Sequence, residues 1–197
     1  MDRSDVKELY FITPIVNVPS IMEYGILSYN LSIKLPHCSV AMQEMQEKRM
    51  VKKIPGTKKK LHDYANLYFD AHNPMLSKRR DQNAEICVMR INSEVIDLPD
   101  VIITDQNASS DYVRFFSVSR GLSAIDKEKL FSRYWTHRDN QYEEWAHKSV
   151  KCAEVLVPDK IEPQYILGIY VANQTALDAI KKLRLGLTVC IKSDIFF

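Results

Sequence analysis

Glu154 stands out first among the residues that could do chemistry, because it interrupts the apolar stretch "KCAEVLVP" at 151–158. In a strand, Ala153, Val155 and Val157 would share one face, and Cys152, Glu154 and Leu156 would share the other. If Glu154 faces a site, we therefore expect Cys152 and Leu156 to line it. A carboxylate is costly to bury unless it has a charged partner or faces a ligand. From this stretch alone, Glu154 is therefore either a buried ion-pair residue or a site residue.

Arg49 is a second candidate, because its charge continues an apolar stripe. Residues 39–50 are predicted to form a helix, and Met42, Met45 and Arg49 share one face of it at spacings of three and four. One alternative is an arginine at the edge of the core whose charged end reaches solvent. A functional guanidinium would instead bind a phosphate or another anion with its planar fork of donors.

A third group lies between residues 62 and 76, where aromatic and polar side chains are crowded together. Aromatic rings interleaved with amides, next to basic residues, suit stacking and hydrogen bonding to a single-stranded nucleic acid. A structural loop whose aromatic side chains fill the core would explain the same composition. The residues concerned are His62, Asp63, Tyr64, Tyr68, Phe69, His72, Asn73 and Met75.

The charge of the chain is concentrated in one segment. The net charge is +2, whereas residues 48–80 contain ten basic and two acidic residues, a local balance of +8. The remaining 17 basic and 23 acidic residues give −6. A basic segment on an otherwise acidic molecule favours a phosphate-rich partner bound at one place, and a solvated lysine-rich loop is the alternative.

Several other kinds of site are not indicated. The four cysteines are scattered without a CxxC pair, which predicts small buried side chains in a reducing cytoplasm, and neither a metal site nor a disulfide framework. His37, His137 and His147 lack ligand-like spacing, so we expect them at the surface or at helix caps. No GxGxxG turn, P-loop or GxSxG elbow occurs. Apolar runs fall short of the roughly 18 residues that span a bilayer, and no secretory signal is evident, so we expect a cytoplasmic protein without membrane contact.

The elements that would position these residues form an α+β pattern. With 197 residues, 46% of them hydrophobic and 26% charged, we expect one domain spanning residues 1–197. Short strands spread from end to end favour a mixed or antiparallel sheet over a regular βαβ repeat. Strands are predicted at 8–13, 85–91, 101–104, 151–158, 165–171 and 188–191, helices near Pro19–Gly25 and at 39–50, 123–135 and 175–183, and irregular structure at 61–75.

An ordered set of motifs resembles the DarT family, the toxins of bacterial DarT–DarG toxin–antitoxin systems. The motifs are "LYFITPIVNVPSIMEYGIL" near the start, "MQEKR" at the end of the predicted helix, "LHDYANLYFDAHNPML", "TDQNASSDYVRFF" and "AEVLVP". They run from about residue 8 to 158, and the tail "VCIKSDIFF" also fits. Their shared order over nearly the whole chain is far more specific than any one motif.

The resemblance implies a fold and an activity. DarT proteins have an ADP-ribosyltransferase fold related to diphtheria-toxin and PARP-like enzymes, with a split β-sheet core and peripheral helices. They consume NAD and attach ADP-ribose to a base of single-stranded DNA, in a sequence-specific manner. The base is thymine in one branch and guanine in another. The implied partner is a macrodomain antitoxin that removes the modification, and we expect a monomeric enzyme without a metal.

The resemblance also implies roles for individual residues. The NAD-binding residues would be Phe11, Ile12 and Thr13 around the nicotinamide, Ser20 and Leu27 on the same wall, and Arg49 on the pyrophosphate within a helical element from about Ser32 to Val51. Glu154 matches the catalytic glutamate, and Arg49 lies near the reacting base. The expected nucleic-acid contacts are His62, Tyr64, Tyr68, Asn73, Met75, and, within the substrate-positioning segment from Thr104 to Glu154, Asn107 and Arg114.

Two positions depart from the family pattern. Phe11 stands where the family usually has histidine. Its backbone N–H and C=O can still bind the nicotinamide amide, but its side chain supplies no imidazole hydrogen bond. Asn107 stands where some relatives have histidine, so the choice of base is left open.

The implied chemistry suits these residue types. Cleavage of the nicotinamide–ribose bond builds oxocarbenium-like charge on the ribose, which a carboxylate such as Glu154 stabilises in a partly dry site. Because a guanidinium is a poor proton acceptor, we expect Arg49 to stabilise the base anion electrostatically. Thymine is the favoured acceptor. Guanine, RNA or a protein side chain as acceptor, and a non-catalytic module that binds single-stranded nucleic acid, remain alternatives.

Overall fold

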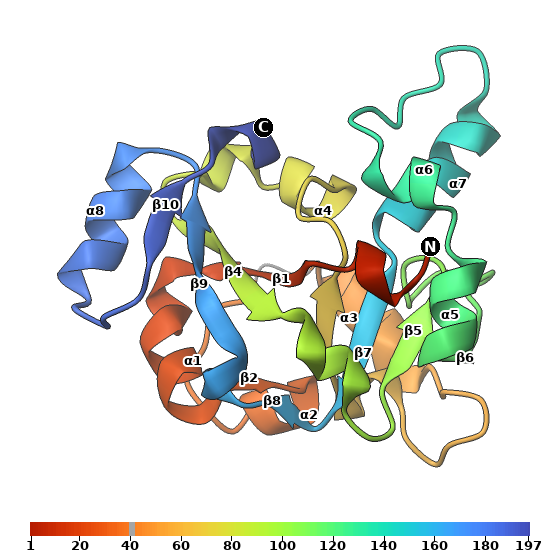
Figure 1. Cartoon of the computed structure of the whole chain (residues 1–197), viewed down its shortest axis with the longest axis horizontal. Coiled ribbons are helices and arrows are strands. Elements are labelled where there is room, and N and C mark those ends of the chain that lie inside the picture. Colours follow the sequence, from red (N-terminus) through yellow and green to blue (C-terminus); the bar gives the residue numbers. More distant parts are fainter. Residues whose placement is uncertain (40–41) are drawn as a thin grey trace.

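A mixed sheet with helices around it forms the molecule (Figure 1). The computed structural model describes residues 1–39 and 42–197. The sheet has the strand order β10-β9-β4-β1-β3-β7-β5-β6, in which β10 and β9 are parallel and the other pairs antiparallel. Its strands are β1 (Glu8–Pro14), β3 (Tyr64–Tyr68), β4 (Ile86–Asn92), β5 (Ile102–Thr104), β6 (Phe115–Ser117), β7 (Glu154–Pro158), β9 (Ile166–Val171) and β10 (Val189–Ile191).

The helices lie around this sheet. A two-stranded ladder of β2 (Ile26–Leu27) and β8 (Lys160–Ile161) lies below it. Helix α8 covers the β10 end, and α5 packs against β5 and β6 at the other end. The α-helices are α1 (Val18–Tyr24), α2 (Tyr29–Ser32), α3 (Gln43–Val51), α4 (Pro74–Ser77), α5 (Val118–Ala124), α6 (Lys127–Phe131), α7 (Gln141–Lys151) and α8 (Gln174–Lys182).

The sheet is split in its middle. Strands β1 and β4 pair along seven positions, from Glu8 with Asn92 to Pro14 with Ile86. By contrast, the described register between β1 and β3 pairs Tyr10 with Tyr68 alone. Past this point β1 runs on toward Pro14 and β3 back toward Tyr64 without further pairing. On the side of β1 that faces β3, backbone N–H and C=O groups of residues 11–13 and the C=O of Pro14 are therefore available to a ligand wherever they point to that side. The fold is the predicted α+β class with a split sheet.

The core is built from the two halves of the sheet. Strands β4 and β7 are buried almost throughout, and Leu9, Met89, Val155 and Ile169 are fully buried in the main hydrophobic cluster. Burial of such a side chain contributes about 1.5–3 kcal/mol, which fixes the register of the central strands. The face of β7 opposite Val155 carries Glu154, as the alternation of "AEVLVP" predicts.

Most predicted elements are confirmed, with boundary changes. Helix α3 begins at Gln43, while Val40 and Ala41, which the prediction placed in it, lie outside the described residues. Glycine ends α1 as expected, since Gly25 has φ +88. The single helix predicted at 123–135 is wrong, because α5 ends at Ala124 and Asp126 caps a separate α6.

Four further predictions are wrong in whole or in part. Residues 61–75 are not wholly irregular, since Tyr64–Tyr68 form β3 in the centre of the sheet. Residues 151–153 belong to the end of α7 and its cap, so the strand predicted from 151 begins at Glu154. His147, predicted at the surface or a cap, is 6% exposed and hydrogen-bonds Ser132 Oγ and the Lys129 carbonyl. Two of the cysteines predicted as buried, Cys38 and Cys190, are exposed.

Candidate active site

The split between β1 and β3 opens into a cavity of about 200 Å³. Strand β1 contributes Phe11–Pro14 to its wall and β3 contributes Tyr64, Asn66 and Tyr68. Helix α1, the β2 segment and α3 close its other sides. A cavity at the point where two half-sheets diverge presents strand backbone and side chains to the same ligand, which is typical of a preformed binding site.

All six residues predicted to bind NAD line this first cavity. They come together because β1 carries three of them, α1 one, β2 one and α3 one, and these elements meet at the split. They are Phe11, Ile12, Thr13, Ser20, Leu27 and Arg49. Their binding role stays a prediction.

A second cavity lies directly beside the first. Five residues line both cavities and form the wall between them: Gln46, Arg49, Asn66, Tyr68 and Met75. Its remaining wall comes from the α3 and α4 segments, the loop after β5 and the end of α7, through Met42, Met45, Pro74, Lys78, Arg79, Asn107, Ser109 and Cys152. Met42, Met45 and Arg49 thus share one face of the helix segment, as predicted. Two ligands held in these cavities would meet at Arg49.

Arg49 and Glu154 form an ion pair at this wall. Nη1 of Arg49 lies 3.1 Å from both carboxylate oxygens of Glu154. The Glu154 side chain is fully buried, whereas 12% of the Arg49 side chain is exposed. Of the two alternatives posed for Glu154, the structure shows the buried ion-pair residue. Glu154 lines neither cavity and reaches the shared wall only through Arg49, so its role as a site residue stays a prediction. In the ligand-free molecule, Arg49 lies between the cavities and the carboxylate.

The loop after β5 fixes the Glu154 carboxylate from the other side. The backbone N–H of Ala108 donates to Oε1 at 2.9 Å. The Glu154 N–H donates to Thr104 Oγ1 at 2.9 Å, and Thr104 donates to the Gln106 carbonyl at 2.7 Å. Burial of this charge is possible because Arg49 and a backbone donor compensate for lost water. The 104–109 loop and β7 thus act together to orient one carboxylate.

Two weakly acidic side chains beside Glu154 stay neutral. Tyr68 pairs with Glu154 across β3 and β7, and burial together with that negative charge raises its pKa well above the usual value. Burial raises the pKa of the Cys152 thiol to about 12. Cys152 lines the second cavity as expected from its place on the Glu154 face. Leu156, predicted to line the site with it, instead packs in a separate core cluster with Ile54 and Tyr64.

His62 is a buried part of the first cavity. Its ring stacks on Tyr29 with centroids 4.0 Å apart, and its Nε2 lies 3.0 Å from Oε1 of Gln46. Burial and the nearby Arg49 charge lower its pKa, which favours the neutral ring. Because only 4% of its surface is exposed, His62 contacts neighbouring side chains and hardly touches solvent.

The other predicted nucleic-acid contacts divide into two groups. Tyr64, Tyr68, Met75 and Asn107 line one or both cavities. Asn73 is fully buried, and its amide oxygen accepts the N–H groups of Met75 and Leu76 as the N-cap of α4. We therefore correct its role to a structural cap.

Arg114 lies outside both cavities. Its Nε is 2.7 Å from Asp105 Oδ2, and its backbone N–H donates to the other oxygen of that buried carboxylate. The ion pair closes the loop that carries Asn107 and Ala108. Two-thirds of the Arg114 side chain is exposed, so the guanidinium is accessible at the surface.

The cavity residues missed from the sequence include four with polar or aromatic side chains: Asn17, Tyr29, Gln46 and Asn66. The Asn17 amide donates to Thr13 Oγ1 at 3.1 Å and binds both backbone groups of Cys38, so it fixes one rim of the cavity. Gln46 had a detectable signal, because it precedes Arg49 by three residues in the "MQEKR" motif. Single polar residues such as Asn17 carry no spacing that indicates a cavity.

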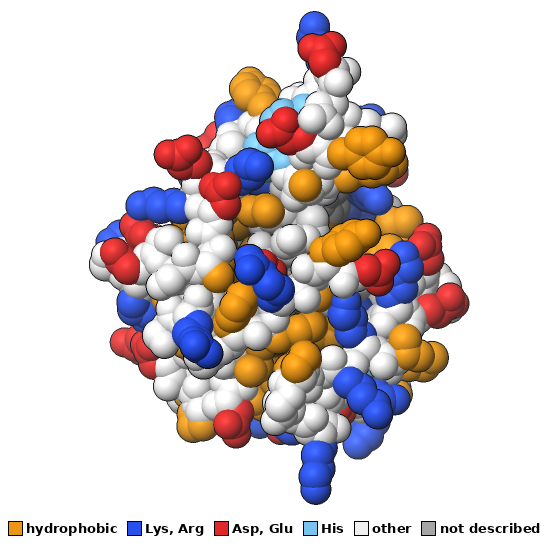
Figure 2. All heavy atoms as spheres, turned by 90° about the vertical axis from the view of Figure 1, so that its right-hand side faces the viewer, with side chains coloured by type: hydrophobic (Ala, Val, Ile, Leu, Met, Phe, Trp, Pro, Cys, Tyr) orange, Lys and Arg blue, Asp and Glu red, His pale blue; other side chains and the backbone are white. Residues whose placement is uncertain are grey.

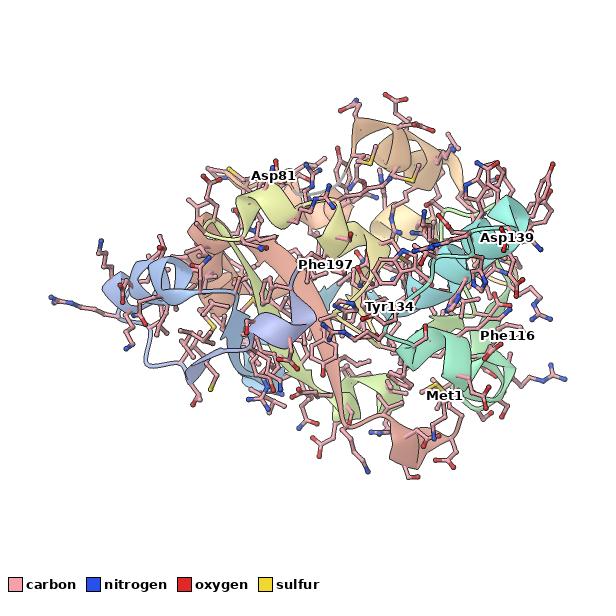
Figure 3. All side chains as sticks on the ribbon, turned by 90° about the horizontal axis from the view of Figure 1, so that it is seen from above. Met1, Asp81, Phe116, Tyr134, Asp139 and Phe197 are labelled. Carbon is pink, nitrogen blue, oxygen red and sulfur yellow. The ribbon has the colours of Figure 1, made fainter. Side chains whose placement is uncertain are left out.

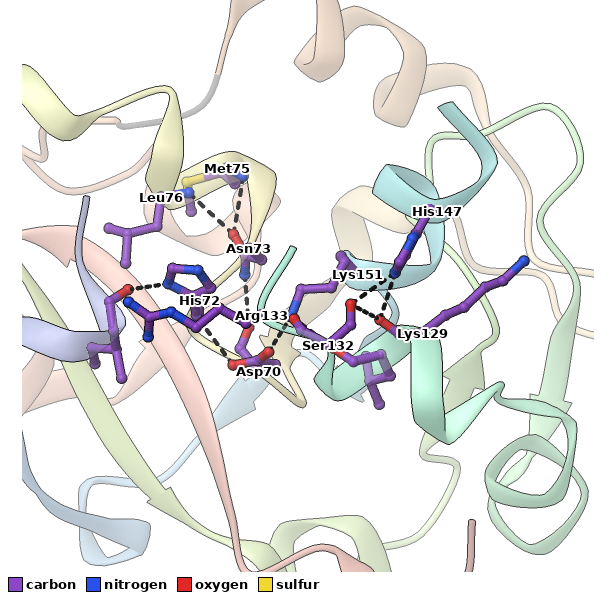
Figure 4. Close-up of polar contacts among 12 residues, drawn as sticks. Asp70, His72, Asn73, Met75, Leu76, Lys129, Ser132, Arg133, His147 and Lys151 are labelled. Carbon is purple, nitrogen blue, oxygen red and sulfur yellow. Dashed lines mark hydrogen bonds and ion pairs between the residues drawn. The ribbon is translucent and has the colours of Figure 1, made fainter. Parts of the chain in front are cut away.

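A buried network supports the site from behind (Figure 4). Lys151, at the end of α7, is fully buried and pairs with Asp70, two residues beyond β3. Its ammonium also donates to the carbonyls of Leu130 at 2.8 Å and Ser132 at 2.9 Å. The nearby ring of Phe197 stacks on His72 with centroids 4.2 Å apart and lies in the region of Tyr134 (Figure 3). These contacts join the segment that follows β3 to the segment that precedes Glu154.

Two further properties concern the described residues as a whole. Over 1–39 and 42–197, no group of three or more His, Cys, Asp or Glu side chains lies close enough to hold a metal ion. In that same part of the chain, no helix has the length and hydrophobicity needed to cross a bilayer.

A protein-family model matches nearly the whole chain. Its description is "ssDNA thymidine ADP-ribosyltransferase, DarT", and it covers residues 10–197. The chain is 30% identical over 189 residues to the DNA ADP-ribosyl transferase–DNA ADP-ribosyl glycohydrolase fusion protein of Thermosipho africanus. That match covers 89% of this chain and 45% of the fusion protein, so this chain spans about half the length of that relative.

Solved structures with the same fold agree with this match. Thermus sp. 2.9 DarT in complex with ADP-ribosylated ssDNA superposes with a TM-score of 0.81 and 26% identity, covering 98% of this chain and 97% of that one. Thermosipho africanus DarTG in complex with ADP-ribose gives a TM-score of 0.79 at 30% identity, over 97% of this chain and 51% of that one. The fold of this chain thus has counterparts in proteins of known structure.

Proposed function

Because this chain belongs to the DarT family of single-stranded-DNA thymidine ADP-ribosyltransferases, we propose that it transfers ADP-ribose from NAD to a thymine base of single-stranded DNA. The observation that carries this proposal is the Arg49–Glu154 ion pair at the wall between two adjoining cavities. Such an arrangement lets one carboxylate and one guanidinium act on two substrates at their meeting point. We further propose that residues 1–197 form a single, monomeric catalytic domain.

NAD occupies the first cavity in this proposal. Backbone groups of Phe11–Pro14 on the free side of β1 bind the nicotinamide amide, which requires no side-chain imidazole at Phe11. The opposite wall offers the rings of Tyr29 and Tyr64 for stacking. Arg49 reaches the pyrophosphate with its planar donors. This pose directs the nicotinamide–ribose bond toward the wall that hides Glu154.

The acceptor base occupies the second cavity. Met42, Met45 and Met75 give it adaptable apolar walls, and Lys78 and Arg79 supply positive charge for the DNA phosphates. A base from a single strand enters without the unpairing cost of a duplex, a few kcal/mol. Salt-sensitive binding and a preference for single strands follow from this pose.

In the reaction, the bond between the nicotinamide nitrogen and ribose C1′ breaks, and nicotinamide leaves as a neutral molecule. A bond forms between C1′ and a thymine ring nitrogen, whose proton passes to solvent. Glu154 stabilises the positive charge on the ribose and accepts a hydrogen bond from a ribose hydroxyl. Arg49 stabilises the negative charge on the base.

This chemistry requires the ion pair to rearrange. In the free molecule the Glu154 carboxylate is fully buried and faces Arg49 and the Ala108 N–H. When the NAD phosphates and the base anion attract Arg49, its guanidinium moves from Glu154 to these ligands. The carboxylate then faces the ribose. Substrate binding thus assembles the catalytic arrangement, a form of induced fit.

Mass spectrometry of oligonucleotides tests the proposal directly. The protein is incubated with NAD and single-stranded oligonucleotides that each contain one kind of base, in DNA and RNA forms. We expect an ADP-ribosyl adduct on thymine-containing DNA and one nicotinamide released per adduct. Adducts on guanine or RNA would redirect the acceptor assignment, and binding without nicotinamide release would leave only a binding module.

A toxin role is part of the same proposal. The Thermosipho africanus relative is a fusion of a DNA ADP-ribosyl transferase with a DNA ADP-ribosyl glycohydrolase. We propose that a macrodomain antitoxin counteracts this chain in the same way, by removing ADP-ribose from DNA. Expression of the chain alone should arrest bacterial growth, and co-expression with such a glycohydrolase should restore it.

A further inference from the structure

Gln46 occupies an unusual position in the site. It lies on α3 one turn before Arg49, and both residues line the wall shared by the two cavities. Side chains three positions apart on a helix are neighbours, so a base that meets the Arg49 guanidinium also comes within reach of the Gln46 amide. This inference rests on the proposed function, because it needs the acceptor base in the second cavity.

His62 fixes the orientation of the Gln46 amide. The Oε1 atom of Gln46 lies 3.0 Å from His62 Nε2. His62 cannot easily turn, because it is buried and its ring stacks on Tyr29. A neutral imidazole with its proton on Nε2 donates to Oε1 and leaves the NH₂ group of Gln46 as the end available to a ligand. The amide is thus held as a hydrogen-bond donor toward the site.

A fixed donor beside Arg49 matches one kind of base edge. In thymine, carbonyl oxygens flank the ring N3 on both sides and share its negative charge after deprotonation. A donor at this place stabilises a carbonyl oxygen, and more strongly as the oxygen becomes anionic. Cytosine and adenine carry an amino group, itself a donor, at the corresponding edge. The NH₂ of Gln46 and the amino group of the base would then face each other, and neither would have a hydrogen-bond acceptor.

We propose that Gln46 determines the specificity of the acceptor site by donating its NH₂ to a carbonyl oxygen of the base. His62 is a positioning residue that holds the amide in this orientation. Donation to O4 selects thymine or uracil over cytosine and adenine, whereas donation to O2 would not exclude cytosine, which keeps that carbonyl. With either oxygen the pair supplements Arg49 in stabilising the anion. Methyl recognition, which would separate thymine from uracil, is left to the methionine walls.

A combination of base analogues and variants tests the hydrogen bond itself. Thymine is compared with 4-thiothymine and 2-thiothymine in otherwise identical oligonucleotides, since a thiocarbonyl is a weak acceptor. Thiolation also changes the acidity of the ring nitrogen, but this effect is common to every variant and cancels in the comparison. The readout is the adduct formation rate of wild type, Gln46→Met and Gln43→Met on each base.

Gln43 is a matched control on the same helix. It is exposed, its amide donates to Glu47 at 3.1 Å, and neither cavity includes it. We expect Gln43→Met to keep the wild-type rates. Gln46→Met should slow thymine modification about 10- to 100-fold, the range for a hydrogen bond to a charged group. It should also lose the discrimination against one of the two thio analogues, which identifies the carbonyl oxygen concerned.

His62→Phe separates positioning from contact. Phenylalanine keeps the stack on Tyr29 and removes the donor to Gln46, so we expect a smaller loss, about two- to tenfold. The inference would be overturned, and the proposed function would stand, if the ratio of the thymine rate to each thio-analogue rate were the same in wild type and in Gln46→Met. A Gln46→Met protein that slows thymine and both analogues equally would assign Gln46 a structural role and overturn it too. Absence of any adduct with wild type would instead contradict the proposed function.

Discussion

Two partners stabilise the Glu154 carboxylate, and they differ in how firmly the structure holds them in place. The Ala108 N–H belongs to a loop that Thr104 and the Asp105–Arg114 ion pair hold in place. Arg49 belongs to the short helix α3, which forms part of the wall between the two cavities. If Arg49 moved away, the buried Glu154 carboxylate would keep only the Ala108 N–H, which does not offset the cost of burying its charge. Its charge is therefore available to stabilise a cationic ribose when Arg49 moves away.

Glu154→Gln removes this charge and keeps the shape of the side chain. The new amide oxygen can still accept from Ala108, but Arg49 loses its ion-pair partner, so the thermal unfolding midpoint should fall. Adduct formation should fall by about a hundredfold or more, as for loss of a preorganised charge-stabilising group. The rate is measured as nicotinamide released and adduct formed per minute. Glu162→Gln, an exposed residue paired with Lys160, is the control, and a Glu154→Gln enzyme as fast as this control would contradict the catalytic assignment.

Two buried histidines predict how stability depends on pH. Burial is the main cause that lowers the pKa of both His62 and His147 in the folded protein. The unfolded chain therefore takes up these protons at a higher pH than the folded chain does. The free energy of unfolding should fall as the pH drops below about 6.5, the usual histidine value, toward the lowered values.

Urea titrations at pH 7.5 and pH 5 measure this effect. The urea midpoint of wild type should be lower at pH 5. His62→Gln should lose less of its midpoint between these pH values, because one of the two responsible protons is gone. The exposed His37→Gln should behave as wild type. A pH response in His62→Gln as large as in wild type would assign the effect to other groups.

Residue patterns predicted the charged members of the site better than its neutral ones. Glu154 and Arg49 were detectable because each interrupts an apolar pattern, and charge in such a place needs compensation. Gln46 and Asn17 interrupt nothing, since a neutral amide is common on any helix. Asn73 was assigned to DNA because its type suits base contacts, whereas the start of α4 uses it as a cap. The amide of Asn73 correctly indicated a hydrogen-bonding residue, but the tertiary structure decides which groups it bonds.

At the scale of elements, the split between β1 and β3 is what creates the site. Strand β3 was predicted as irregular, because "YANLY" has no Val or Ile and no regular alternation of apolar and polar residues. It is nevertheless central, since β7 pairs with all five of its residues from Tyr64 to Tyr68. Tertiary pairing overrides weak local propensity here. The strands rich in branched residues, β4 and β9, were predicted within two residues of their ends.

Gly25 connects α1 to the cavity wall at β2, and its substitution should damage both. Its φ is +88, and an added Cβ would lie 2.2 Å from the Ile161 carbonyl oxygen in β8. Gly25→Ala must therefore strain the backbone and push β2 from β8, which we expect to cost about 3 kcal/mol or more of unfolding free energy. Leu27 would move with β2, so NAD binding should weaken as well.

Gly56→Ala is the matched control for that change. Gly56 also has a positive φ, +77, but an added Cβ would meet no atom within 4 Å. Gly56→Ala should therefore lose only the free energy of placing alanine in the left-handed backbone conformation, about 1–2 kcal/mol. Urea unfolding measures both variants, and calorimetric NAD titration measures the cavity. If Gly25→Ala were no more destabilised than Gly56→Ala, the close approach to β8 would not constrain this turn.

At the scale of the whole molecule, charge is distributed around the second cavity in a way that suits DNA. The basic segment at 48–80 contributes Arg49 to the shared wall and Lys78 and Arg79 to the second cavity. Part of its charge is used internally, since Lys48 pairs with Glu44 and Lys59 with Asp159. On the face seen in Figure 2, Lys and Arg side chains are interspersed with hydrophobic ones and also with Asp and Glu.

Lys78 offers the sharpest test of this distribution, because it is exposed and lies at the second cavity. If it contacts one DNA phosphate, Lys78→Gln should weaken oligonucleotide binding and reduce the slope of log K against log salt by about 0.7. Lys182→Gln, on α8 at the far end of the sheet, loses the same charge and should keep the wild-type slope. Fluorescence anisotropy of a labelled thymine oligonucleotide at several salt concentrations measures both slopes. Equal slopes for the two variants would mean that net charge alone attracts DNA, whereas a change confined to Lys78→Gln would place a phosphate beside the second cavity.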